Sequence, residues 1–127
     1  MIGRSAFAAT AILLIGVGLL TRLPLIPWPP EVAKYLGSSL WGAMVFCVIG
    51  VCLPRLAVVL LMLLAFVIAA AVEASQLWHP AWLDAFRRTT IGVLLLGRYF
   101  SFADIATYAV GIGSAGAVTA LLAGRRN

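Results

Sequence analysis

The sequence predicts an all-α, polytopic membrane protein with four transmembrane helices and a short interfacial or re-entrant segment between the third and the fourth. Of its residues, 64% are hydrophobic and only 10% are charged, and the mean hydropathy is +1.11. These values lie outside the range of soluble domains. The apolar residues form runs of about 20, the length of one bilayer crossing. We expect residues 1–127 to form a single transmembrane domain.

Four apolar runs supply the predicted spans. The first, residues 5–21, gives about 26 Å of helix at about 1.5 Å per residue, enough for a thin hydrocarbon core. The second, residues 35–53, follows an interfacial loop that contains four prolines, which exclude a continuous helix. The third, residues 56–78, ends before Pro80, because proline disfavours helical geometry in the preceding residue. The fourth, residues 102–123, is rich in glycine and alanine.

The segment between the third and fourth runs, residues 81–97, has a different composition. It contains Asp84, Arg87 and Arg88, and then the apolar stretch 91–96, which is too short to cross a bilayer. We expect a short interfacial helix followed by an apolar, re-entrant loop. Backbone at that depth must find its hydrogen-bond partners in protein or water.

The charge pattern limits the classes of function. The net charge is +5, but the basic residues stand singly or in pairs at the edges of apolar runs rather than in one patch. This pattern is typical of membrane flanks, so we expect anionic lipids and no nucleic acid as partners. The tryptophans are expected at the membrane interface.

Catalytic and metal-binding patterns are not recognisable in the sequence. It contains no nucleophile with a base at a known spacing, no glycine-rich phosphate loop and no metal-ligand motif, so we expect no cofactor and no metal. An acid and base pair of Glu73 and Asp104 remains open, because the sequence does not place the two residues relative to one another. An enzyme is therefore the less favoured class.

Four spans place both termini on one side of the membrane. The third connection is the segment between the third and fourth runs. If its basic residues belong to a folded site, the positive-inside rule puts the termini in the cytoplasm and the site on the outer side. The cations that then flank the spans on the cytoplasmic side are Arg4, Arg55, Arg125 and Arg126.

Polar and ionisable side chains gather around this third connection. Ionisable residues at the ends of apolar helices are costly and mark a candidate functional site. Glu73 and Gln76, three residues apart, share one helix face. A buried Glu73 is either protonated or paired with a cation such as Arg87 or Arg98. The candidate ligand-binding residues are Glu73, Gln76, Arg87, Arg88, Arg98, Ser101, Asp104 and Tyr108.

Each feature of this cluster also has a structural explanation. Arginines fit phosphate oxygens, but Arg87 and Arg88 equally suit the solvated face of an interfacial helix. Ser101 and Asp104 have the spacing of a helix capping box. Tyr108 lies one turn after Asp104, a spacing that is also typical of packing. Small residues in the fourth run, such as Gly113 four residues after Ala109 and Gly116 four residues before Ala120, allow close contact with a partner or with a second copy.

At these residues the chain resembles the VanZ-like group of small bacterial membrane proteins. The shared pattern is Glu73-x-x-Gln76, a variable stretch, Arg98-x-x-Ser101-x-x-Asp104, and then Gly111. Within that group it is similar to a bacterial family catalogued as a domain of unknown function, through residues 73–77 and 95–101. The chain carries Tyr108 where VanZ-like proteins usually carry asparagine. The resemblance implies the bacterial cytoplasmic membrane and a connection with cell-envelope lipids or lipid-linked precursors.

Three functional hypotheses follow. The leading one is a polar pocket that binds an anionic lipid headgroup or a lipid-linked envelope intermediate. In the second, the protein is structural or binds a partner, and the polar cluster is an ion-pair staple. In the third, the protein is a small lipid transporter or an enzyme acting on lipid phosphate.

Overall fold

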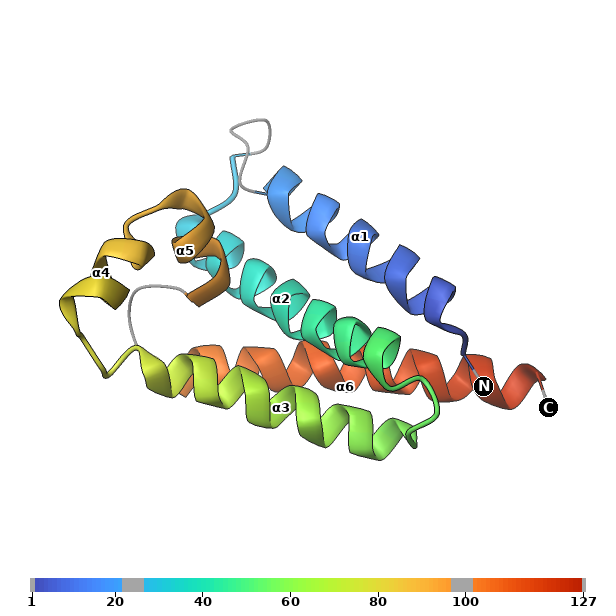
Figure 1. The fold of residues 1–127 in the computed structure, drawn as a ribbon. Helices are drawn as coiled ribbons and strands as arrows, with labels where there is room; N and C mark the ends of the chain where they lie inside the picture. Colours follow the sequence, from blue (N-terminus) through green and yellow to red (C-terminus); the bar gives the residue numbers. More distant parts are fainter. Residues whose placement is uncertain (1, 22–26, 97–101, 127) are drawn as a thin grey trace.

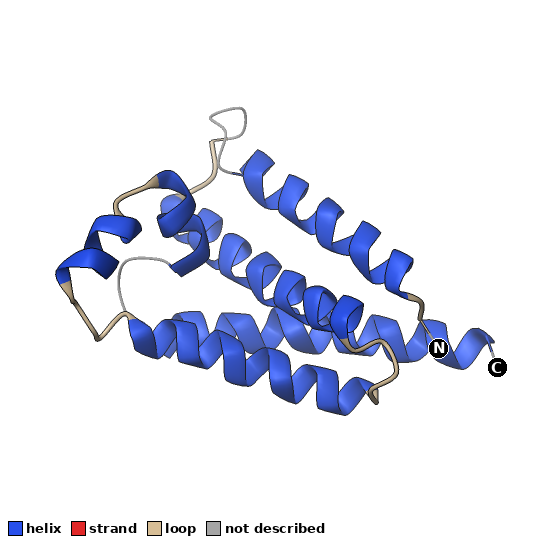
Figure 2. Ribbon diagram, in the orientation of Figure 1, coloured by secondary structure: helices blue, strands red, loops and turns tan. Residues whose placement is uncertain are grey.

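The computed structural model describes residues 2–21, 27–96 and 102–126, and these ranges are helical without strands. The helices are α1 (Arg4–Thr21), α2 (Pro30–Cys52), α3 (Val58–Ser75), α4 (Ala81–Arg87), α5 (Thr90–Leu96) and α6 (Phe102–Arg126) (Figures 1 and 2). Four of them, α1, α2, α3 and α6, are long and apolar enough to cross a membrane. The predicted fold class is confirmed.

The long helices pack around α2. Helices α3 and α6 contact each other and both contact α2, whereas α1 contacts α2 alone among the described helices. The short helices α4 and α5 lie together at one end of the bundle, and both chain termini lie at the other end (Figure 1). We call these the α4/α5 end and the terminal end.

Helix α2 begins at Pro30, five residues earlier than predicted. The prolines before residue 35 indicated a loop, but a proline at the first helical position is well tolerated. Its φ angle is already helical, and the N–H that it lacks would have no partner in the first turn. As a consequence Lys34 belongs to α2 rather than to a loop.

The end of α3 and the stretch after α4 also differ from the sequence prediction. Helix α3 ends at Ser75, three residues early, because the next residues form a tightened turn in which the N–H of Gln76 donates to the carbonyl of Glu73 at 3.1 Å. The loop predicted for residues 91–96 is wrong, since this stretch is helix α5; whether the segment is interfacial or re-entrant stays a prediction. The hydroxyl of Thr89 accepts a hydrogen bond from the N–H of Gly92 at 3.0 Å, which caps the start of this helix.

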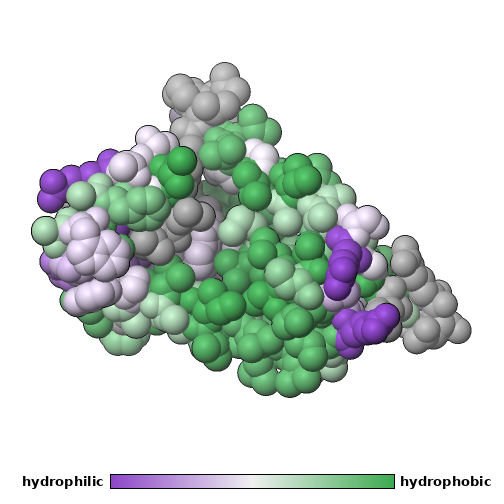
Figure 3. Space-filling view, viewed as in Figure 1, coloured by the Kyte–Doolittle hydropathy of each residue, from purple (hydrophilic) through white to green (hydrophobic). Residues whose placement is uncertain are grey.

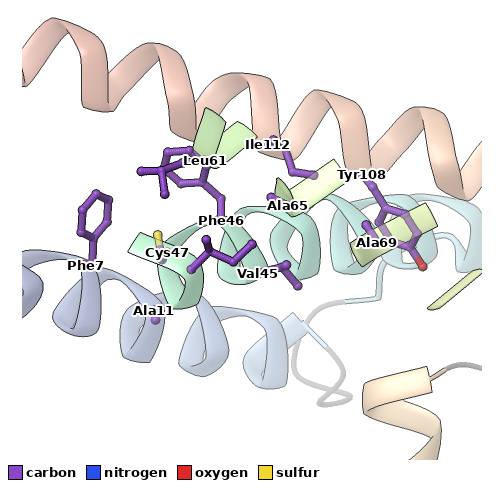
Figure 4. Packing of buried hydrophobic residues seen from close by; sticks show 11 residues of the cluster. Phe7, Ala11, Val45, Phe46, Cys47, Leu61, Ala65, Ala69, Tyr108 and Ile112 are labelled. Carbon is purple, nitrogen blue, oxygen red and sulfur yellow. The ribbon is translucent and has the colours of Figure 1, made fainter. Parts of the chain in front are cut away.

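The apolar core lies between the long helices. Figure 4 shows Phe46 of α2 in one cluster with Leu61 of α3, Ile112 of α6 and Phe7 of α1. The Phe7 and Phe46 rings meet edge to face, with centroids 6.1 Å apart. Many large apolar side chains on the outer faces of α1 and α3 are exposed, and Figure 3 shows this surface as a broad hydrophobic area. Such a surface suits a helix bundle in contact with lipid.

The closest approach of α2 and α6 requires two glycines. A Cβ on Gly42 would lie 2.9 Å from the carbonyl oxygen of Tyr108, and a Cβ on Gly111 would overlap the carbonyl oxygen of Ser39. Both obstacles are backbone atoms, which cannot rotate away. The two helices can therefore touch at this crossing only while both positions lack a side chain.

The other small residues of α6 fall on different faces. Gly116 lies against the side chain of Met62 in α3, so it takes part in internal packing. Ala109 is exposed, and a Cβ on Gly113 would meet no atom within 4 Å. Homo-oligomerisation through this helix stays a prediction.

Replacing Gly111 by alanine should destabilise the protein by about 1–3 kcal/mol, the usual cost of overpacking, because α2 and α6 must move apart. The matched control is Gly113→Ala in the same helix, which should be neutral or slightly stabilising because alanine favours helix formation. Unfolding of both variants in mixed detergent micelles measures the difference. Equal free energies of unfolding for the two variants would contradict the assigned crossing.

Candidate functional site

The buried polar side chains in the described part of the chain all belong to the predicted cluster. They are Glu73, Gln76, Arg87 and Asp104. They come from the end of α3 and the turn that follows it, from α4 and from the first turn of α6, and thus gather at the α4/α5 end (Figure 1). Tyr108 is buried as well, and Arg88 is exposed. The predicted site residues Arg98 and Ser101, and with Ser101 the predicted capping box, lie outside the described residues.

Glu73 is the centre of this cluster. Its side chain is 0% exposed, and its Oε2 accepts a hydrogen bond of 2.9 Å from the Tyr108 hydroxyl. A carboxyl group in an apolar bundle is costly unless hydrogen bonds satisfy it. The Glu73–Tyr108 hydrogen bond therefore also ties α3 to α6.

Trp41 adds α2 to this contact. Its ring lies 5.1 Å from the Tyr108 ring between centroids. Its indole Nε1 is buried, and no hydrogen-bond acceptor reaches it from the residues that the structure describes. Sequence reasoning gave tryptophans an interfacial position, whereas Trp41 is part of the packing around the buried tyrosine.

Asp104 and Gln76 complete the buried set. Asp104 Oδ1 lies 3.8 Å from the Nζ of Lys34, whose side chain is 54% exposed. Glu73, Gln76 and Asp104 all have interaction partners. Lys34 was missed by sequence reasoning because it was assigned to a loop, and the proline at the start of α2 was the signal that could have placed it on a helix.

Arg87 has a structural set of contacts. Its guanidinium donates to the carbonyl of Trp78 at 2.8 Å, to the carbonyl of Ser75, and to Asp84 Oδ1 at 3.1 Å. The two carbonyls lie at and just after the end of α3, where the last carbonyls of a helix lack partners within it. Arg87 therefore caps α3 and fastens α4 to it. Its acidic partner is Asp84 rather than the predicted Glu73.

Asp84 lies outside the spans, at the surface of α4. The hydrogen bond with His79, at 3.2 Å, and the nearby Arg87 guanidinium hold the pKa of the Asp84 carboxyl below its ordinary value of 3.8. The His79–Asp84–Arg87 contacts thus join the turn after α3 to α4.

The cluster has two zones that differ in burial and charge. Glu73, Gln76 and Asp104 offer buried oxygen acceptors between α3 and α6. Lys34 and Arg88 add exposed cations at the same end of the bundle. Among the described residues, no group of three or more side chains is arranged to hold a metal ion.

Removal of the Tyr108 hydroxyl tests the buried hydrogen bond. Tyr108→Phe should lower the free energy of unfolding by about 1–2 kcal/mol, because the Glu73 carboxyl loses a buried donor. The matched control is Tyr35→Phe in α2, whose ring is exposed, and this change should cost nothing measurable. Unfolding in mixed micelles compares the two, and a loss of equal size in both would refute the assigned hydrogen bond.

The contacts of Asp84 predict a direction of pH dependence. Because its pKa is lowered in the folded protein, the ionised carboxyl stabilises the fold above the ordinary value of 3.8. This contribution is lost as the pH falls through the lower pKa of the folded state. A carbon NMR titration of the Asp84 carboxyl should give a midpoint below 3.8 in the wild type and a higher one in His79→Gln. An unchanged midpoint in that variant would contradict the assigned cause.

A comparison with known protein families gives one result that covers most of the molecule. The family model described as "Protein of unknown function (DUF2809)" matches residues 28–112, which include Glu73, Gln76, Asp104 and Tyr108. No solved structure matches the chain. The expected similarity to a family of unknown function is confirmed, and the connection with VanZ-like proteins stays a prediction. The match covers more than half of the sequence, so the chain belongs to the DUF2809 family of proteins of unknown function.

Proposed function

We propose that this membrane protein binds the headgroup of an anionic lipid, or of a lipid-linked cell-envelope intermediate, at its α4/α5 end. The observation that carries the proposal is the fully buried Glu73 carboxyl, held by Tyr108 close to the buried Gln76 and Asp104. Ionisable groups inside a spanning bundle are expensive to keep and are by default a sign of function.

The two zones of the cluster suit the two parts of such a headgroup. Lys34 and Arg88 supply exposed cations for a phosphate, and Arg98 adds a third cation in the sequence. The buried oxygens of Glu73 accept hydrogen bonds from hydroxyl or amine groups. The indole N–H of Trp41, which has no acceptor among the described residues, is a donor for a ligand oxygen.

The position of the site favours a ligand that resides in the membrane. Trp78 and Trp82, next to the cluster, are exposed and stack edge to face with centroids 5.6 Å apart. Exposed tryptophans of this kind typically lie at headgroup level. With the termini in the cytoplasm, as the positive-inside rule favours, the site faces outward in the bacterial cytoplasmic membrane. The resemblance to VanZ-like proteins points to the same class of envelope lipids.

A structural role is the second candidate, and the contacts of Arg87 favour it. This side chain is 4% exposed, and its hydrogen bonds go to the end of α3 and to Asp84. In this candidate function the polar cluster staples α3, α4 and α6 together and binds no ligand.

Glu73→Gln separates the two candidates, because glutamine keeps the shape of the side chain and still accepts the hydrogen bond from Tyr108. For a ligand site, we expect a folded variant that binds lipid roughly 10- to 100-fold more weakly, as follows from losing a hydrogen bond to a charged group. Native mass spectrometry of protein extracted from bacterial membranes measures the lipid adducts. The matched control is Glu31→Gln, which removes an exposed carboxylate from the first turn of α2.

Three results of this experiment decide between the candidates. Loss of an adduct in Glu73→Gln, with the adduct kept in Glu31→Gln, supports the headgroup site. Identical adducts in the wild type and in Glu73→Gln, together with a lower unfolding temperature for the variant, support the staple. Equal loss in both variants would show that net charge alone governs the binding.

A further inference from the structure

A second feature lies at the terminal end of the bundle, away from the polar cluster. An open hollow of about 560 Å³ is lined by residues 2–4, at the start of α1, and by residues 52–56, in the connection between α2 and α3. Two arginines, Arg4 and Arg55, belong to this lining. They are far apart in the sequence and come from different elements.

The packing of α1 on α2 brings these two segments together. The Phe7 ring lies directly over Gly50, where an added Cβ would come within 2.7 Å of the ring. This contact is about one turn after Arg4 and five residues before Arg55. In the connection, the N–H of Leu56 donates to the carbonyl of Leu53 at 3.2 Å, which closes the turn that carries Arg55.

Among the described residues, no acidic side chain balances the charge of this hollow. The four acidic residues of the chain are Glu31, Glu73, Asp84 and Asp104, and all of them lie near the α4/α5 end. Glu31, in the first turn of α2, is separated from Cys52 by roughly 30 Å of helix, well beyond a Debye length of about 8–10 Å. Arg4 and Arg55 form no ion pair with the described residues.

The remaining lining is apolar and lies at the end of the spanning helices. Ile2, Leu53 and Leu56 line the hollow beside the arginines, and the exposed apolar faces of α1 and α3 lead away from it. Bilayer phosphates are expected at the ends of membrane-spanning helices, and lipid acyl chains can follow the apolar helix faces. Figure 3 shows hydrophilic surface at this end directly beside the hydrophobic area.

We infer that this hollow is a second lipid site, in which Arg4 and Arg55 hold the phosphate of an anionic phospholipid from the leaflet on the terminal side. The rigid fork of an arginine fits phosphate oxygens, and two arginines that line one hollow favour a lipid with a net negative headgroup over a zwitterionic one. The site shares no residue with the cluster around Glu73 and does not depend on the function proposed for it.

The test is a titration of the full-length protein in detergent with phosphatidylglycerol, followed by native mass spectrometry. Phosphatidylcholine and inorganic phosphate are the comparison probes. The double variant Arg4→Gln, Arg55→Gln should bind phosphatidylglycerol at this site roughly 30-fold more weakly. The double variant Arg4→Lys, Arg55→Lys keeps the charge and should retain part of the affinity. Circular dichroism and the unfolding temperature should not change, because both arginines are exposed.

The matched control removes two charges elsewhere at the same end of the bundle. Arg125→Gln with Arg126→Gln changes the last turn of α6 and should leave this binding intact. Unchanged affinity in the Arg4 and Arg55 glutamine variant would overturn the inference, as would an equal loss in the control. Displacement of the lipid by millimolar inorganic phosphate would overturn the lipid assignment in favour of free phosphate. Glu73→Gln should leave this adduct in place, so failure at one site is distinguishable from failure at the other.

Discussion

The close approach of α2 and α6 at Gly42 and Gly111 is the constraint on which the polar cluster depends. The carbonyl of Tyr108 lies against Gly42, so this contact fixes the backbone from which the tyrosine side chain extends. From that position its hydroxyl reaches Glu73 of α3, and its ring lies beside Trp41. A shift of α6 by even a fraction of its radius would leave the Glu73 carboxyl without this donor. Backbone packing and buried hydrogen bonding are therefore coupled.

The two ends of the bundle differ in their chemistry. The α4/α5 end contains acidic, amide and basic side chains. Several of them form hydrogen bonds within the protein, as the contacts of Arg87 show. At the terminal end, Arg4 and Arg55 line a hollow, and no acidic side chain of the described residues lies near it. A helix bundle whose sides contact lipid thus offers two distinct polar surfaces to the two faces of a membrane.

Sequence reasoning predicted the parts of the fold that depend on composition and missed those that depend on local geometry. The four spans follow from apolar runs of sufficient length, and the same runs are the long helices. The start of α2 was placed too late because prolines were taken only as helix breakers, although Pro30 occupies the position where a helix accepts one. Helix α5 was missed for two reasons. The apolar stretch was too short to span a membrane and was therefore taken as a loop, and the capping hydroxyl of Thr89 was not considered.

The candidate site shows the same division. The sequence identified Glu73, Gln76, Arg87 and Asp104, because polar residues among apolar runs stand out, and these residues are buried. The contacts of these residues could not be derived from the sequence. The hydrogen bond of Glu73 with Tyr108, for example, joins residues 35 apart and depends on how α3 packs against α6. Arg87 turned out to pair with Asp84, one helical turn away, because its other donors reach the end of α3.

The position of Glu73 near the end of α3 has a consequence for biogenesis. Because the chain is synthesised from its N-terminus, α3 enters the membrane before α6 exists. During this interval the carboxyl of Glu73 lacks the hydrogen bond from the Tyr108 hydroxyl. Glu73 lies two residues before the last residue of α3, where a side chain can stay close to water during this interval. The same carboxyl at the middle of α3 would lie within the hydrocarbon core until α6 supplies the hydroxyl of Tyr108. We therefore expect that moving the acid one or two turns toward the start of α3 impairs membrane insertion before it affects the stability of the finished bundle.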